Sequence, residues 1–160
     1  MPVTPKDVAC EWLALAWNTG SDAGIDRLMS ANALCHGLPS SEGRPVLGPG
    51  DFKACARRFR SAFPDLRVSV VKTIAEGEFV AVHCRMTGTH MGPGLEVPPT
   101  MKPVRFVGVA IVQVRNGRIV ESWHSFDFLS LQQQIGLAAP AGAGFGTAPA
   151  SPGATTWQSA

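Results

Sequence analysis

The stretch VRFVGVAIVQVRNGRIVESWHSFDF, residues 104–128, decides the fold. It predicts two strands joined by Asn116-Gly117, a dipeptide that strongly favours a two-residue β-hairpin. The first strand is apolar at successive positions, so both of its faces are expected to be dry. One face can pack on helices. The other predicts either an apolar cavity enclosed by a curved sheet or a dimer surface.

The rest of the folded part alternates between helical and extended patterns in separate blocks. Helical spacing of apolar residues comes first, period-two alternation begins after Pro64, and a short helical pattern ends at Gly136. The predicted helices are residues 4–18, 21–29, 51–63 and 128–136, and the predicted strands are 32–38, 66–75, 79–90, 104–114 and 118–127. Helices and strands segregated in this way predict an α+β fold.

Composition predicts a single domain followed by a tail. The chain has 160 residues, of which 45% are hydrophobic and 16% charged, and this fits one globular domain with a substantial core. Residues 137–160 contain no charged side chain and are dominated by Ala, Gly and Pro. We therefore expect a domain over residues 1–136 and a tail without a core of its own over 137–160.

Charge and spacing exclude several classes of function. A net charge of +2, with no basic run longer than Arg57-Arg58, gives no footprint for nucleic acid. The N-terminal apolar run contains Glu11 and lacks a basic leader, and no run approaches the length of a membrane span, so we expect a cytoplasmic protein without membrane association. Four cysteines without a C-x-x-C pair and four histidines without H-x-H or H-x-x-x-H spacing predict reduced thiols and no metal site.

Three segments together resemble the SnoaL-like polyketide cyclases, also called ester cyclases. They are FPDLRVSVVKTIAEGEFVAVHCRMTGTHMG (63–92), VPPT (97–100) and GVAIVQVRNGRIVESWHSFDFLSLQQQIG (108–136). This family is part of the superfamily of nuclear transport factor two, ketosteroid isomerase and limonene epoxide hydrolase. The chain departs from the family pattern at Met101, since the family commonly has Gly after PPT, and at CHGLPSSEG (35–43), which replaces an extended acidic segment.

The resemblance implies a specific architecture and chemistry. The fold would be a cone-shaped, curved antiparallel sheet packed with three N-terminal helices around a deep apolar pocket, with a short C-terminal helix, usually in a homodimer. Its best-known members close a polyketide ring by intramolecular aldol condensation, using an aspartate as acid and base, with no metal or other cofactor. By position, that aspartate corresponds to Asp127.

Asp127 also has a structural alternative. It stands directly before the last predicted helix, where an Asp side chain caps free backbone N–H groups. Strict alternation places Glu121, Trp123 and Asp127 on one face of the last strand, and His124 and Phe126 on the other. Asp127 and His124 therefore point the same way only if a bulge intervenes.

Histidines are the other candidates for acid–base chemistry. His124 has an ordinary pKa near neutrality, which suits proton transfer, although an exposed or interface histidine is an equal alternative. His36 ends the short predicted strand, and this position would suit the mouth of the cavity. The side chains expected to contact substrate are Trp12, Phe59, Met86, Phe106, Trp123 and His90, the last of which can alternatively anchor its loop.

The sequence thus predicts a cofactor-independent cyclase of secondary metabolism that acts on a hydrophobic, carbonyl-rich small molecule. Isomerisation or epoxide opening in the same pocket is an alternative, but Arg105 with Asp127 lacks the second aspartate that epoxide opening requires. A non-catalytic module that binds an apolar ligand or a partner protein is the alternative from another class. Nucleophile-elbow, P-loop and dinucleotide-binding motifs do not occur in the sequence.

Overall fold

The computed structural model describes residues 2–40, 43–95 and 97–138. The predicted tail lies outside the described residues from 139 onward, so the domain boundary stays a prediction. The elements are α1 (Pro5–Leu13), the π-helix η1 (Ala14–Thr19), α2 (Asp22–Leu28), β1 (Met29–His36), β2 (Val46–Leu47), α3 (Gly48–Ala62), β3 (Arg67–Glu76), β4 (Phe79–Thr89), β5 (Pro103–Arg115), β6 (Arg118–Phe126) and α4 (Phe128–Ile135).

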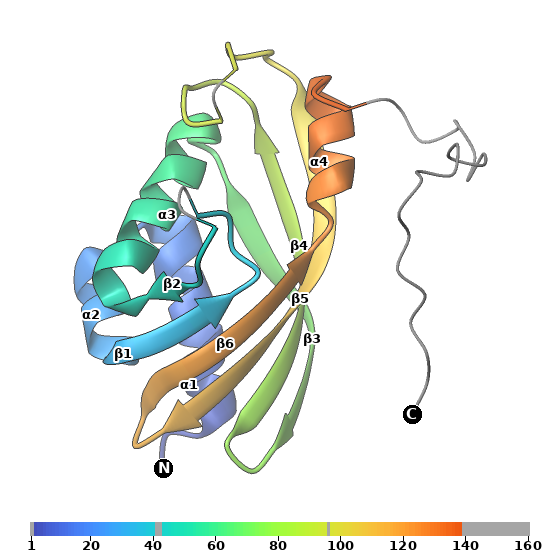
Figure 1. Cartoon of the computed structure of the whole chain (residues 1–160). Helices are drawn as coiled ribbons and strands as arrows, with labels where there is room; N and C mark the ends of the chain where they lie inside the picture. Colours follow the sequence, from blue (N-terminus) through green and yellow to red (C-terminus); the bar gives the residue numbers. More distant parts are fainter. Residues whose placement is uncertain (1, 41–42, 96, 139–160) are drawn as a thin grey trace, which may run out of the picture.

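The strands form one curved sheet that confirms the predicted α+β class (Figure 1). Its order is β2-β1-β6-β5-β4-β3, and β3 to β6 are antiparallel neighbours. The sheet is mixed rather than wholly antiparallel, because β1 pairs with β6 in parallel. The long connection between these two strands, which contains α3 and the other strands, allows this parallel pairing. The sheet is open, with β2 and β3 at its two edges.

The predicted hairpin and first helix form as their local sequence requires. Asn116 and Gly117 both have positive φ, 51° and 71°, as a tight turn between paired strands demands. The Thr4 side chain caps α1 and the Asp7 carboxylate returns the contact, which completes a capping box. The predicted helix of residues 4–18 continues as η1, and this change to π geometry is a feature that the periodicity did not predict.

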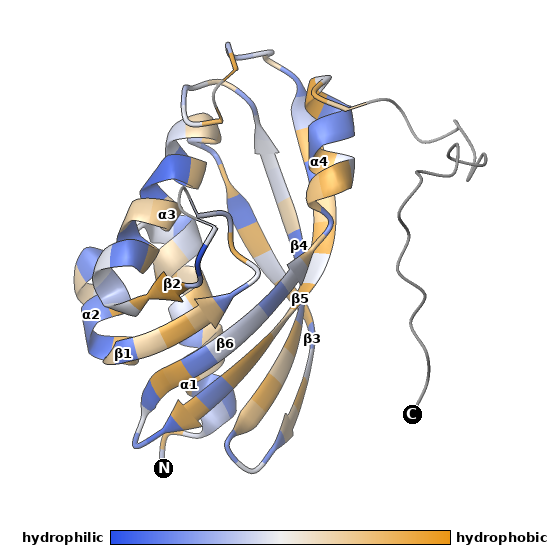
Figure 2. Ribbon diagram, in the orientation of Figure 1, coloured by the Kyte–Doolittle hydropathy of each residue, from blue (hydrophilic) through white to orange (hydrophobic). Residues whose placement is uncertain are grey.

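The helices cover one face of the sheet and bury a continuous apolar core. Trp12 of α1 and Phe52 of α3 are fully buried, with ring centroids 4.9 Å apart. Hydrophobic residues follow one another along β5 (Figure 2). Those at even positions from 104 to 112 face the core, whereas Val107, Val109 and Ile111 face outward and are exposed. Both faces of this strand are therefore apolar, as the sequence predicted.

A β-bulge sets which residues of β6 face the core. Val114 pairs with Ile119 and Gln113 pairs with Glu121, so Val120 has no partner on β5. Ile119, before the bulge, is fully buried, and so is Ser122 after it. Beyond the bulge the alternation is regular.

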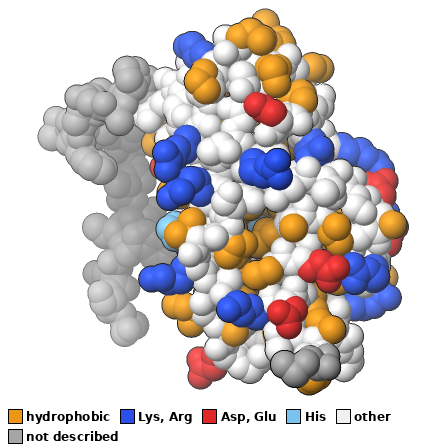
Figure 3. Space-filling model, turned by 180° about the vertical axis from the view of Figure 1, so that it is seen from behind, with side chains coloured by type: hydrophobic (Ala, Val, Ile, Leu, Met, Phe, Trp, Pro, Cys, Tyr) orange, Lys and Arg blue, Asp and Glu red, His pale blue; other side chains and the backbone are white. Residues whose placement is uncertain are grey.

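Apolar side chains also lie exposed across the middle of the rear face, with basic side chains at the flank (Figure 3). Several belong to the edge strand β3, including Val70, Val71 and Ile74. No helix within the described residues is both long and apolar enough to span a membrane.

Candidate functional site

An apolar cavity lies between the sheet and the helices and contains about 20 Å³ of free space. Ten residues line it: Leu13, Trp17, Leu38, Phe59, Leu66, Val68, Met86, Phe106, Phe126 and Phe128. None of these side chains is charged, and five carry aromatic rings. The free space is large enough for about one water molecule, so a ligand can enter only after side chains that line the cavity move.

A wider hollow of about 390 Å³ adjoins the cavity between α3 and α4. Phe59 and Phe128 line both spaces, and their ring centroids are 5.8 Å apart. Arg58 also lines the outer hollow, where its Nε donates a hydrogen bond to the carbonyl of Gly94 at 2.7 Å. The two phenylalanines therefore separate an apolar chamber from a vestibule with a basic group at its wall.

His124 lies on the inner face of β6, behind the apolar cavity. Its ring centroid is 5.6 Å from that of Phe126, a cavity residue, and 5.9 Å from that of Trp12. Nε2 lies 2.9 Å from the Ser122 hydroxyl, whereas Nδ1 is buried and has no hydrogen-bond partner among the described residues. Burial, and to a smaller extent the charge of His36, lowers the pKa of His124 to about 4. The imidazole is thus neutral at pH 7.

Phe126 stands between His124 and the cavity. Its ring lies over Gly108, its partner on β5, and a Cβ at Gly108 would come within 1.8 Å of Phe126 Cδ1. Phe128 packs against the same ring edge-on, with centroids 5.9 Å apart. Only a glycine at position 108 leaves room for Phe126 in this orientation. The ring is half-buried, and it contacts both the cavity and the ring of His124.

Asp127 takes the structural role that the sequence left open. It is exposed, and its carboxylate accepts a hydrogen bond from the Ser130 backbone N–H at 2.9 Å as the N-cap of α4. Together with His83 it borders a shallow hollow over β4 and β5. Asp127 does not line the apolar cavity. Among the described residues, no hydrogen bond joins its carboxylate to the free nitrogen of His124.

His36 and Trp123 belong to the outer face of the sheet. They are partners across β1 and β6, and their rings stack with centroids 5.7 Å apart. His36 Nε2 lies 2.8 Å from a carboxylate oxygen of Glu121, so these two side chains form a pair. Trp123 is half-exposed and does not line the apolar cavity. The structure thus places His36 and Trp123 apart from the cavity that they were predicted to border.

His90 is fully buried at the base of the loop 91–101. Its Nδ1 accepts a hydrogen bond from the Thr100 N–H at 3.3 Å, and its backbone pairs with Lys102 and Met101. The ring packs on Phe63 at 5.5 Å. These contacts favour the alternative of an anchor for the loop.

The predicted wall residues Phe59, Met86 and Phe106 do line the apolar cavity. Trp12 lies behind it, and its indole Nε1 is buried without a hydrogen-bond partner in the described part of the chain. Phe126, Phe128 and Ser122 were not predicted. Alternation from His124 could have found Ser122 and Phe126, two residues to either side on the same face.

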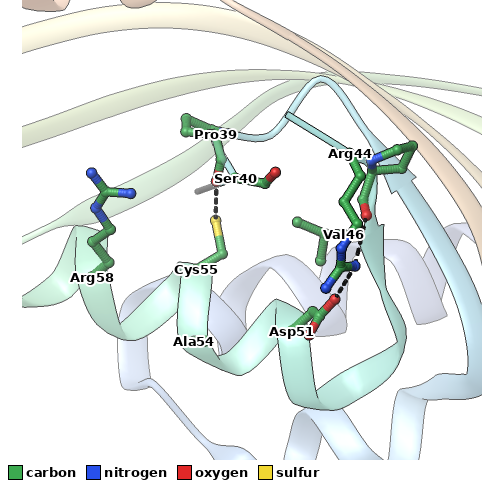
Figure 4. Close-up of a pocket in the computed structure, with 9 residues that line it drawn as sticks. Pro39, Ser40, Arg44, Val46, Asp51, Ala54, Cys55 and Arg58 are labelled. Carbon is green, nitrogen blue, oxygen red and sulfur yellow. Dashed lines mark hydrogen bonds and ion pairs between the residues drawn. The ribbon is translucent and has the colours of Figure 1, made fainter. Parts of the chain in front are cut away.

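A more polar hollow of about 200 Å³ lies between the segment that follows β1 and α3 (Figure 4). Arg44 pairs there with Asp51 at 2.8 Å, and Cys55 Sγ lies 3.7 Å from the carbonyl of Pro39. Burial raises the pKa of Cys55 to about 11, so this thiol is not a nucleophile at neutral pH. Nor do the described residues contain three or more His, Cys, Asp or Glu grouped to hold a metal ion.

The fold is α+β, with a curved sheet and helices around an apolar cavity, and this architecture is that of a domain that binds small molecules. Comparison with known proteins identifies the family. The model of the SnoaL-like polyketide cyclases matches residues 7–135. The chain belongs to this family, and the predicted resemblance is confirmed. Comparison with curated proteins gives no significant match.

Solved structures agree with this membership. A candidate polyketide cyclase from Bacillus cereus ATCC 10987 is 29% identical with a TM-score of 0.71, and the match covers 84% of this chain and 82% of that one. IdmH, a candidate polyketide cyclase from Streptomyces antibioticus, is 28% identical with a TM-score of 0.73, covering 83% and 99%. AclR, a candidate hydroxylase from Streptomyces galilaeus, is 27% identical with a TM-score of 0.72, covering 87% and 85%. The family supports a cyclase-type enzyme, while its neighbours carry more than one assigned activity.

Proposed function

We propose that this protein closes a ring in a hydrophobic, carbonyl-rich molecule by an aldol-type reaction, with His124 as the acid–base group. The observation that carries the proposal is the free Nδ1 of His124, which is buried on the inner face of the sheet beside an apolar chamber. Asp127, the residue that the family resemblance suggested, is exposed and occupied as a helix cap. The geometry favours the histidine.

The reaction needs one proton acceptor that later returns the proton. His124 removes a proton from the carbon beside one carbonyl, and the resulting enolate carbon forms a bond to a second carbonyl carbon. The oxygen of that second carbonyl becomes an alkoxide, which receives the proton back from the imidazolium. Atoms and electrons balance without an oxidant or reductant. Burial lowers the pKa of His124 to about 4, so the ring is unprotonated at pH 7 and has a lone pair available to accept the proton.

Two further groups support this chemistry. Trp12 Nε1–H is a buried donor without a partner among the described residues, on a ring next to that of His124. It can donate to the carbonyl oxygen on which the enolate charge develops. The substrate reaches both groups after Phe126 rotates off Gly108. Phe59, Met86 and Phe106 then hold the apolar body of the substrate in place, which supplies the orientation that a single base does not.

The test compares His124→Gln with Asp127→Asn. Each purified protein is offered a panel of aromatic ketones with a second carbonyl placed to close a six-membered ring, and products are separated by chromatography and identified by NMR. A general base contributes about 10²- to 10⁴-fold, so His124→Gln should lose at least 100-fold in kcat while Asp127→Asn stays near wild type. Loss in Asp127→Asn with activity retained in His124→Gln would refute the assignment.

Non-catalytic ligand binding is the second candidate, and one observation favours it: His124 is not among the residues that line the chamber. Binding is measured with the apolar fluorophore ANS (8-anilinonaphthalene-1-sulfonate) and by quenching of Trp17, which lines the chamber. Saturable binding without conversion of any panel compound would favour this function. An isomerase or a cyclase gives a product with the mass of its substrate, whereas epoxide opening adds the mass of water.

We also propose a homodimer formed through the outer face of the sheet. Ile74, Ala81, Ile111 and Trp123 are in register across β3, β4, β5 and β6, and they form one apolar row. Ile111 is 43% exposed and its neighbours Val107 and Val109 are 44% and 39% exposed. A flat apolar face at the centre of a sheet, and not at its edge, fits a second copy related by a two-fold axis.

A further inference from the structure

Ser122 is a buried hydroxyl that the proposed reaction does not use. It is fully buried on the inner face of β6, and its Oγ lies 2.9 Å from Nε2 of His124. The two side chains are two residues apart on one strand, so the alternation holds them side by side. The hydroxyl therefore contacts the nitrogen opposite to the one assigned to catalysis.

Cys35 completes this line of buried polar groups. It pairs with Ser122 across the parallel strands β1 and β6, and it is fully buried as well. Burial raises the pKa of the Cys35 thiol to about 11, whereas a hydrogen bond with Ser122 acts in the opposite direction. At pH 7 this thiol is protonated, so the Ser122 hydroxyl can either donate to the sulfur or accept from the S–H. When the hydroxyl donates to the sulfur, its oxygen lone pairs are left to accept a hydrogen bond from His124.

The number of available protons then determines which ring nitrogen of His124 carries its single proton. A neutral imidazole carries one N–H, and Ser122 has only one proton to donate. If that proton points toward Cys35, the hydrogen bond at 2.9 Å requires the proton of His124 to be on Nε2. The opposite tautomer would place an N–H on Nδ1, on a ring whose centroid lies 5.9 Å from that of Trp12 with its own unpaired N–H, and so bury two donors without acceptors among the described residues.

Resting on the function proposed above, we infer that Ser122 is a positioning residue. It holds the proton of His124 on Nε2 and so leaves the lone pair of Nδ1 free toward the substrate. The residue does not touch the reacting atoms. It decides which nitrogen of His124 can act as the base.

The tautomer is measured directly, without substrate. Long-range ¹H–¹⁵N spectra of ¹⁵N-histidine-labelled protein at pH 7 distinguish a protonated from an unprotonated ring nitrogen, and a His124→Gln sample assigns the signals. We expect wild-type His124 to show a protonated Nε2 and an unprotonated Nδ1. A wild-type spectrum with the proton on Nδ1 would overturn the inference, whatever the activity of the enzyme.

Two variants test the role of the hydroxyl. In Ser122→Ala the ring loses a hydrogen bond whose net worth corresponds to a shift of roughly 2- to 10-fold in the tautomer ratio, and kcat should fall by at most that factor with KM unchanged. Ser122→Cys fills the same volume with a weaker acceptor and should give an intermediate ratio. A tautomer ratio unchanged in Ser122→Ala would overturn the inference. A tautomer as inferred together with full activity of His124→Gln would instead refute the proposed function alone.

Discussion

Acid should destabilise this protein through His124, by an amount that follows from its burial. The folded-state pKa is about 4, against 6.5 for an ordinary histidine, so the unfolded chain binds the proton more readily than the folded one. The stability that depends on the neutral ring is complete above pH 6.5 and is lost as the pH falls toward 4. With these two pKa values, the free energy of unfolding falls by about 2 kcal/mol between pH 7 and pH 5 from this residue alone.

The assay is urea unfolding at pH 7, 6 and 5, followed by tryptophan fluorescence, for the wild type and His124→Gln. Hydrogen bonds from Thr4, Arg44 and Arg115 hold the pKa values of Asp7, Asp51 and Glu78 below their ordinary range, so these carboxylates stay ionised throughout the window. The wild type should lose about 2 kcal/mol more than the variant. Val112→Ala, which weakens the core without removing a titratable group, should keep the wild-type pH dependence. Identical pH dependence in wild type and His124→Gln would refute the claim that the ring is buried and neutral.

Three other predictions follow from single positions. Ile111→Glu should convert the proposed dimer to a monomer in sedimentation velocity, while Leu129→Glu, an exposed residue of α4, should not; a dimer in both would place the interface elsewhere. Met101 has a φ of 58° where the family commonly has glycine, so Met101→Gly should raise the free energy of unfolding by about 1 kcal/mol, and a loss of stability would contradict this account of the strain. Asp127→Ala should lower the free energy of unfolding by about 1 kcal/mol, because the helix cap is lost, whereas Asp127→Asn should stay near wild type. Equal losses of stability in both variants would argue against capping.

Local patterns predicted the elements well because the forces that form them are local. The Asn-Gly turn, the capping box at Thr4 and the period change after Pro64 each act within a few residues. The parallel pairing of β1 with β6 could not be predicted in this way, since the partners are about ninety residues apart in the chain. The same limit applies to the cavity: Phe59, Met86 and Phe106 were recognised as apolar, but the Phe126 side chain that closes the chamber depends on a glycine in another strand.

The candidate site was harder to predict than the fold because it depends on which face of β6 looks inward. Ile119, the most apolar residue of that strand, is buried, and simple alternation from it would have turned Glu121, Trp123 and Asp127 toward the core. The unpaired Val120 reverses the phase.

One inserted residue therefore lets the strand begin with a buried isoleucine and end with a buried histidine. It also directs Glu121 outward, where it pairs with His36 instead of carrying an unpaired charge into an apolar core. Bulges are common beside functional sites because they redirect side chains at small energetic cost. Here the bulge turns His124 to the inner face, where we propose proton chemistry, and Trp123 to the outer face, where we propose association between copies. Deletion of Val120 should therefore be tolerated, because Ile119 and Glu121 become consecutive and regular alternation keeps Glu121 outward and Ser122 and His124 inward. Loss of cooperative urea unfolding in this variant, followed by tryptophan fluorescence, would contradict this account of the bulge.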